Sequence, residues 1–350
     1  MNPFFTPKWV TIYVIVLITI GTFVDRTYEG TMLLASLMIC TWLAISLHEL
    51  GHFLFGKWCG YDFIFLAFGP VLIEKESAGV RVKENRNWLF FGGVAMMTPP
   101  QEKRESLMKK MALYTAGGPF ISLLLALFGL GLYELFSYQM LFYFALMNGT
   151  ILMATMLPLK GSMKTDGYVL FTLMKNNDQS RLLMEDLLVS KELLSSKHPS
   201  QYSCEYIQLA KEKPPTVDNL QYAMLIYYHE IEKNGLLAAV NALKEYSAIP
   251  VTSKNKVQIG FLIHMKQLAH FLTGDAEIEK MEKYQQLLGK MEPVSYYRGK
   301  AIIAHMEGDK QTSKENIKKV SKIISQNEKM YGFLTAEKTL TRLVKNKIGD

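Results

Sequence analysis

The sequence predicts a mainly α-helical protein, with a polytopic membrane domain in its first half and a soluble helical domain in its second. Charge is the first reason, because residues 1–175 carry only 14 of the 39 Lys and Arg residues and 11 of the 32 Asp and Glu residues. Hydropathy is the second, since the first half also holds four long apolar stretches. We expect a membrane domain over residues 1–175, a linker over 176–218 and a cytoplasmic helical domain over 219–350.

Each of the four apolar stretches can cross a bilayer as a helix, because a hydrocarbon core about 30 Å thick requires about 20 residues. These stretches are residues 9–24, 31–55, 111–133 and 135–159. The first follows a single basic residue, Lys8, and no small-residue cleavage site comes after it. We therefore interpret it as an anchor rather than as a cleaved signal peptide.

The loop charges predict the orientation of these spans. Nine basic residues lie in segment 56–110, whereas segment 25–30 contains only Arg26 and segment 134–139 contains none. The positive-inside rule then places both termini in the cytoplasm. Three cysteines cannot form a disulfide framework, which fits a reducing compartment. We expect a multi-pass protein of a bacterial cell membrane.

The distribution of charge argues against nucleic acid as a partner. The net charge of +7 is shared between the two halves, and no basic block is interleaved with aromatic residues as in a nucleic-acid-binding module. An anionic lipid surface accounts for the basic excess. We therefore expect the lipid bilayer, and not DNA or RNA, as the charged partner.

The strongest chemical signal is the pattern His-Glu-Leu-Gly-His at residues 48–52, inside the second span. Side chains at positions i and i+4 share one helix face, so His48 and His52 can bind a single metal ion. Glu49 can then accept a proton from water at that ion, as in zinc hydrolases of the H-E-x-x-H type. Ionisable residues within a membrane helix are costly and usually mark function. Position 48 lies roughly 26 Å along the span, close to its cytoplasmic end.

A catalytic zinc ion normally has three protein ligands, so one more side chain is required. Asp166 is the best candidate, because it follows the fourth span after Pro158 and Gly161, which interrupt the helix. Irregular backbone at membrane depth is tolerated where it lines a cavity. The spacing alone leaves a second interpretation open, in which Asp166 caps a helix over residues 167–175.

Segment 61–97, between the second and third spans, is rich in residues that favour β-strands. It contains the apolar run 63–68, the run 71–73, the alternating residues 80–82 and the aromatic stretch 88–91. We expect hydrophobic hairpins near the membrane face. These hairpins could clamp an extended peptide by strand addition, or they could simply pack on the helices.

The second half contains three helix–turn–helix patterns, over residues 220–246, 260–288 and 296–325. Their turns fall at Gly235, Gly274 and Gly308, a spacing that suits tetratricopeptide-like hairpins. A stack of such hairpins usually forms a concave protein-binding surface. The alternative is an irregular helical domain with no groove.

An ordered set of motifs over residues 31–175 resembles the site-2 protease family of intramembrane zinc metalloproteases. Besides H-E-x-x-H, the chain has Gly69-Pro70, a Gly-Gly-x-x-Met loop at 92–96, Ala-Gly-Gly-Pro at 116–119 and Leu157-Pro158 followed by Asp166-Gly167. Three positions depart from the family pattern. Thr155 stands where the family has Asn, the glycine of A-G-P is doubled, and Ser122 replaces an Asn.

The resemblance implies one Zn²⁺ ion held by His48, His52 and Asp166, with Glu49 as the general base of a zinc-activated water. Substrates would be membrane-spanning or short hydrophobic peptides, cut near the cytoplasmic face. Asn148 or Thr155, together with the loop glycines Gly92 and Gly93, could contact the substrate backbone.

Two non-proteolytic functions compete with this interpretation. In one, the protein is a membrane scaffold whose C-terminal helical domain recruits a protein partner, but such a scaffold does not need the carboxylate of Glu49. In the other, it is a metal transporter, which requires polar residues through several spans. Here the polar residues of the spans gather at one depth.

Overall fold

The computed structural model describes residues 5–76, 79–100, 104–159, 164–252, 255–256, 258–289 and 292–349. The chain divides into two compact units, Met1–Glu185 and Asp186–Asp350. As predicted, the described residues are mainly helical and include one small antiparallel sheet.

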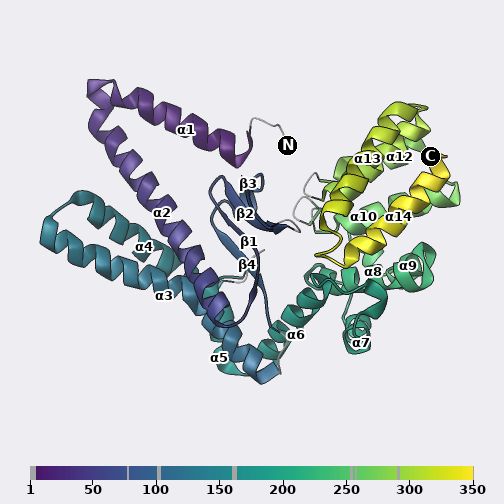
Figure 1. The fold of residues 1–350 in the computed structure, drawn as a ribbon, viewed down its shortest axis with the longest axis horizontal. Coiled ribbons are helices and arrows are strands. Elements are labelled where there is room, and N and C mark those ends of the chain that lie inside the picture. Colours follow the sequence, from purple (N-terminus) through teal and green to yellow (C-terminus); the bar gives the residue numbers. More distant parts are fainter. Residues whose placement is uncertain are drawn as a thin grey trace. The chain divides into compact units, whose positions relative to one another are not determined.

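The first unit is built on four apolar helices, of which α2, α3 and α4 lie side by side (Figure 1). They are α1 (Pro7–Thr22), α2 (Tyr28–Trp58), α3 (Arg104–Phe136) and α4 (Gln139–Met156), with a 3₁₀ turn η2 (Asp25–Thr27) before α2. Within the described ranges, three segments are long and apolar enough to cross a membrane: Asp25–Trp58, Glu105–Phe136 and Gln139–Met156. The first predicted span corresponds to α1, which is apolar but has only 16 residues.

Two glycines bring the backbones of α2 and α3 into direct contact. A Cβ atom added at Gly51 would lie 2.5 Å from the carbonyl oxygen of Gly117, and one added at Gly117 would lie 2.6 Å from that of Gly51. Small residues at a helix crossing permit this close approach within a membrane. In α2 the contact residue Gly51 lies between His48 and His52, and in α3 the contact residue Gly117 precedes Gly118. The crossing therefore places both histidines against α3.

The sheet lies beside α2, which contacts strands β1 and β4 (Figure 1). Its strands are β1 (Asp62–Phe68), β2 (Val71–Glu76), β3 (Gly79–Glu84) and β4 (Val94–Thr98), all antiparallel in the order β3-β2-β1-β4. The short 3₁₀ helix η3 (Trp88–Phe90) precedes β4. Strand β4 therefore pairs with β1 on one edge, and no other described strand pairs with its second edge.

Helices α5 (Asp166–Lys175) and α6 (Asp178–Leu193) follow the apolar helices. Residues 176–218, where we expected a linker, thus include α6, the 3₁₀ turn η4 (Pro199–Gln201) and α7 (Cys204–Glu212). A further 3₁₀ turn, η5 (Val217–Asn219), comes directly before the next helix of the second unit.

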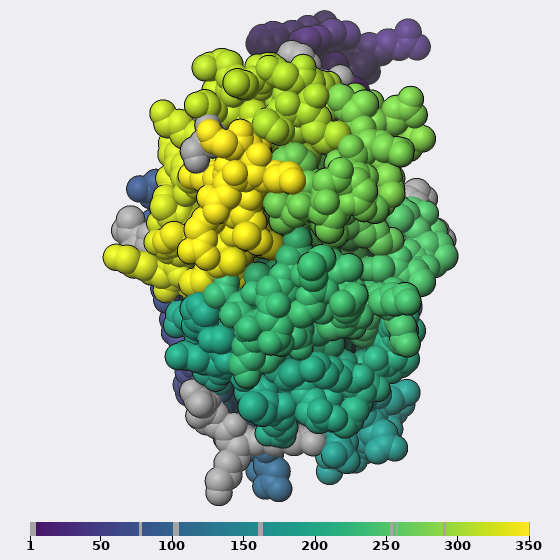
Figure 2. All heavy atoms as spheres, turned by 90° about the vertical axis from the view of Figure 1, so that its right-hand side faces the viewer, coloured from purple at the N-terminus to yellow at the C-terminus, as the bar shows by residue number. Residues whose placement is uncertain are grey.

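The second unit turns at each of the three glycines that the sequence singled out, and each has a positive φ of 82° to 94°. The helices before and after these turns are α8 (Leu220–Asn234) with α9 (Leu236–Ala242), α10 (Gly260–Thr273) with α11 (Ile278–Leu287), and α12 (Pro293–Met306) with α13 (Lys310–Asn327). The 3₁₀ turn η6 (Tyr246–Ala248) follows α9, and α14 (Phe333–Ile348) ends the chain. Helix α14, yellow in Figure 2, contacts α8, α10, α12 and α13.

Candidate metal centre and active site

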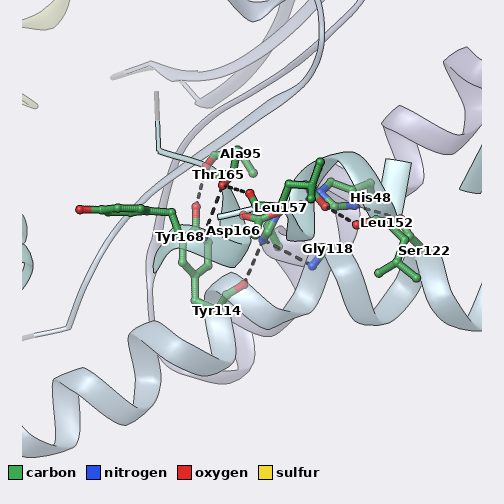
Figure 3. Close-up of polar contacts among 12 residues, drawn as sticks. His48, Ala95, Tyr114, Gly118, Ser122, Leu152, Leu157, Thr165, Asp166 and Tyr168 are labelled. Atoms are coloured by element: carbon green, nitrogen blue, oxygen red, sulfur yellow. Dashed lines mark hydrogen bonds and ion pairs between the residues drawn. The ribbon is translucent and has the colours of Figure 1, made fainter. Parts of the chain in front are cut away.

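Three potential metal ligands converge in the first unit. Their ligand atoms all lie within 4.8 Å of one another. The Nε2 atoms of His48 and His52 are 3.3 Å apart. The Oδ2 atom of Asp166 lies 3.2 Å from Nε2 of His48 (Figure 3). The same oxygen lies 3.4 Å from Nε2 of His52. Both imidazoles are buried, and the Asp166 side chain is only 19% exposed.

These separations fit a single zinc ion. Ligand atoms about 2.0–2.1 Å from a tetrahedral zinc ion lie about 3.3–3.4 Å from one another. A second observation concerns Gly118, which faces the same point from α3. A Cβ atom there would lie 2.3 Å from Nε2 of His52 and 2.7 Å from Nε2 of His48. The absence of a side chain at position 118 thus leaves space where the histidine nitrogens converge. Two imidazoles and one carboxylate also match a catalytic zinc donor set, with one position left for water or substrate.

The approach of Asp166 to the histidines depends on the polypeptide around it. The Oγ1 atom of Thr165 accepts a hydrogen bond from the Tyr168 amide, and its hydroxyl donates to the Leu157 carbonyl at 2.6 Å. Thr165 therefore caps α5, and the alternative in which Asp166 is the cap is wrong. Gly167 brings this turn against α4, because a Cβ atom there would lie 2.0 Å from the Met156 carbonyl oxygen. Gly161, the predicted helix breaker, lies outside the described residues.

The second nitrogen of each imidazole has a partner of its own. Nδ1 of His52 donates to the Tyr114 carbonyl at 3.0 Å, and Nδ1 of His48 lies 2.9 Å from the Ser122 hydroxyl. Such bonds fix the orientation of a metal-binding histidine and leave its Nε2 atom to the metal. The sequence showed that Ser122 departs from the family pattern, but only the structure reveals that it contacts His48.

Glu49 lies beside the candidate ligands, on α2 next to His48. Its side chain is buried, and its carboxylate accepts a hydrogen bond from the backbone N–H of Ala95 in β4. Gly93, with φ of 103°, makes room for it, because a Cβ atom there would lie 2.4 Å from Oε1 of Glu49. The Gly-Gly loop predicted to contact substrate is therefore packed directly against the candidate base.

The other residues predicted to contact substrate form no described hydrogen bond with the candidate metal ligands or with Glu49. Asn148 is fully buried in α4, and its amide donates to the Phe144 carbonyl at 2.9 Å. Its Oδ1 atom has no hydrogen-bond partner in the described part of the chain. Thr155 donates to the Leu152 carbonyl of its own helix at 3.4 Å. Next to Gly93, Gly92 faces open space.

Comparison with known protein families covers most of the chain. The family model for Peptidase family M50 matches residues 35–336, which include every candidate site residue. Among curated proteins and among solved structures, none matches the chain significantly. The predicted resemblance to site-2 proteases is thus confirmed: the chain belongs to Peptidase family M50, a family of membrane-embedded metalloproteases.

Proposed function

We propose that the protein is an intramembrane zinc endopeptidase that cuts membrane-spanning or short hydrophobic peptides near the cytoplasmic face. His48, His52 and Asp166 hold one Zn²⁺ ion, and Glu49 is the general base. The observation that carries this proposal is the convergence of three ligand atoms at 3.2–3.4 Å, the separation that zinc coordination requires.

A bound zinc ion supplies Lewis-acid polarisation of the scissile carbonyl and makes water a nucleophile at neutral pH. The carboxylate of Glu49 takes a proton from the attacking water and returns it to the amine that leaves. The Ala95 N–H donates a hydrogen bond to this carboxylate and so helps to hold it beside the ligands. Glu49 and both imidazoles are buried, so bulk water has little access to these side chains.

Strand β4 is the proposed clamp for the substrate. A helix cannot be cut while its backbone is fully hydrogen-bonded, so the substrate must be extended at the scissile bond. An extended peptide can add to the edge of a sheet, and the second edge of β4 pairs with no other described strand. Because Ala95 on this edge already bonds to Glu49 and Tyr114, the peptide would pair with the rest of the edge. Gly92, which faces open space, would let the peptide approach the loop, where the backbone of Gly93 is a further candidate contact. Asn148 and Thr155 remain candidates for contacts with the peptide backbone.

The second unit is the proposed place for a protein partner. Its helical hairpins each turn at a glycine of positive φ, and the spacing of these glycines supports the comparison with tetratricopeptide hairpins. We propose that they bind a substrate or a regulator on the cytoplasmic side, where the positive-inside rule predicts both termini to lie.

Replacement of Glu49 by glutamine tests the reaction. We expect the rate of peptide cleavage to fall by roughly 10²–10⁴-fold, because the amide cannot accept the proton. Zinc content should stay at that of the parent, because Glu49 is not a ligand. The measurement is cleavage of a transmembrane peptide by purified protein in lipid, with zinc determined on the same samples.

The matched control is Glu29→Gln, which makes the same chemical change at an exposed position of α2. It should cleave at the parental rate. If Glu49→Gln cleaves as fast as Glu29→Gln, Glu49 is not the base. If the parent holds zinc but cuts no hydrophobic peptide, the protein is a scaffold with a structural metal.

A further inference from the structure

One residue of α3, Tyr114, contacts both halves of the candidate active site. Its backbone carbonyl accepts the hydrogen bond from Nδ1 of His52 at 3.0 Å. Its hydroxyl reaches in another direction and donates to the Ala95 carbonyl in β4 at 2.5 Å (Figure 3). Tyr114 thus joins a candidate metal ligand to the edge strand of the sheet.

Ala95 in turn holds the candidate base. Its N–H donates to the Glu49 carboxylate, while its carbonyl is taken by Tyr114. Ala95 pairs with Leu66 of β1 in the strand register. The N–H and C=O of Ala95 nevertheless bond to the side chains of Glu49 in α2 and Tyr114 in α3. Such a residue belongs to a non-hydrogen-bonded pair of an antiparallel ladder, whose N–H and C=O both point outward. The position of Glu49 therefore depends on where β4 lies.

The ring of Tyr114 is fixed from two sides. It stacks on Tyr61 with ring centroids 5.0 Å apart and planes 12° from parallel. The Tyr114 ring also lies against the His52 imidazole, with ring centroids 5.7 Å apart. Tyr61 is itself only 2% exposed and belongs to a buried cluster with Cys59 and Met97. Because packing determines the direction of the ring, the hydroxyl is held at the Ala95 carbonyl.

We infer that Tyr114 is a positioning residue that keeps the general base in register with the metal centre. Its carbonyl orients His52, and its hydroxyl anchors the strand that orients Glu49. The inference rests on the proposed function for its catalytic meaning. Its structural part, the anchoring of β4 by one hydroxyl, can be measured without any reaction.

Tyr114→Phe removes the hydroxyl and keeps the backbone carbonyl and the stacked ring. We expect amide hydrogen exchange in segment 94–98 to become about fivefold faster, the factor that one typical hydrogen bond is worth. We also expect kcat for a transmembrane peptide to fall by a similar factor, with KM and zinc content unchanged. The full chain in lipid is used for the exchange, zinc and rate measurements.

Tyr61→Phe is the matched control, because it removes a hydroxyl from the other ring of the same stack. It should leave the exchange of segment 94–98 and kcat at their parental values. Equal exchange in Tyr114→Phe and Tyr61→Phe would overturn the anchoring, whatever the activity. Faster exchange with parental kcat would overturn the catalytic part. If the parent cleaves no peptide at all, the proposed function fails while the exchange result still decides the anchoring.

Discussion

Replacement of Gly118 by alanine is expected to eliminate zinc binding and peptide cleavage together. The added Cβ atom would lie 2.3 Å from Nε2 of His52 and 2.7 Å from Nε2 of His48, at the point where both nitrogens face a common ion. Relief of this clash by movement of α3 away from α2 would break the backbone contact between Gly117 and Gly51. Competition with a chelator of known zinc affinity should show a loss of at least about 100-fold, the upper range found when the support of a metal ligand is removed.

The control for this substitution is Gly131→Ala in the same helix. No atom lies within 4 Å of a Cβ atom built at Gly131. The two variants change helix propensity equally, so any difference between them reports on the space at position 118. Parental zinc affinity in Gly118→Ala would mean that the ion does not occupy the space beside position 118. The proposed metal site at the two histidine nitrogens would then be wrong.

The largest expected effect on stability comes from Glu337→Gln in the second unit. Glu337 pairs with the fully buried guanidinium of Arg298, which also donates to His264, Thr341 and the Glu337 carbonyl. Burial and the charge of Arg298 hold the pKa of His264 well below its usual range, so this imidazole is a neutral acceptor. Loss of the carboxylate would remove the direct ion-pair partner of this buried charge and leave Glu292 as the acidic neighbour of Arg298. We expect the free energy of unfolding to fall by about 3–5 kcal/mol.

Pulse proteolysis of the full chain in urea, with mass spectrometry of peptides from residues 186–349, measures this change. Lys338→Ala is the control on the next residue of α14. The Lys338 side chain is 66% exposed and pairs with Glu328 at 2.9 Å, so its loss should cost less than about 1 kcal/mol. If Glu337→Gln is no more destabilising than Lys338→Ala, the buried pair does not hold the second unit together.

The local features of the site could be predicted because each follows from the helical spacing of residues or from a residue that interrupts a helix. Spacing on a helix predicts that His48 and His52 share a face, and a helix break after Pro158 predicts that the chain near Asp166 departs from the spans. The turns of the second half could be predicted in the same way, because glycine is the residue that readily adopts a positive φ.

The remaining features depend on contacts between segments far apart in the sequence. Local pattern left two roles open for Asp166, and the bonds from Thr165 to Leu157 and Tyr168 exclude the capping role. The role of Tyr114 is likewise invisible in sequence, because it requires the approach of β4 to α3. The Ala-Gly-Gly-Pro motif at 116–119 is visible in the sequence, but the sequence does not show that Gly118 faces the two imidazoles.

X-ray absorption at the zinc edge of the purified protein in lipid tests the central claim most directly. We expect one zinc ion per chain, with two nitrogen atoms and carboxylate and water oxygens at about 2.0–2.2 Å. In Asp166→Asn, the carboxylate contribution should disappear and the zinc content should fall. A protein that cleaves hydrophobic peptides without zinc, or whose zinc spectrum is the same after Asp166→Asn, would contradict a metal centre built from α2 and α5.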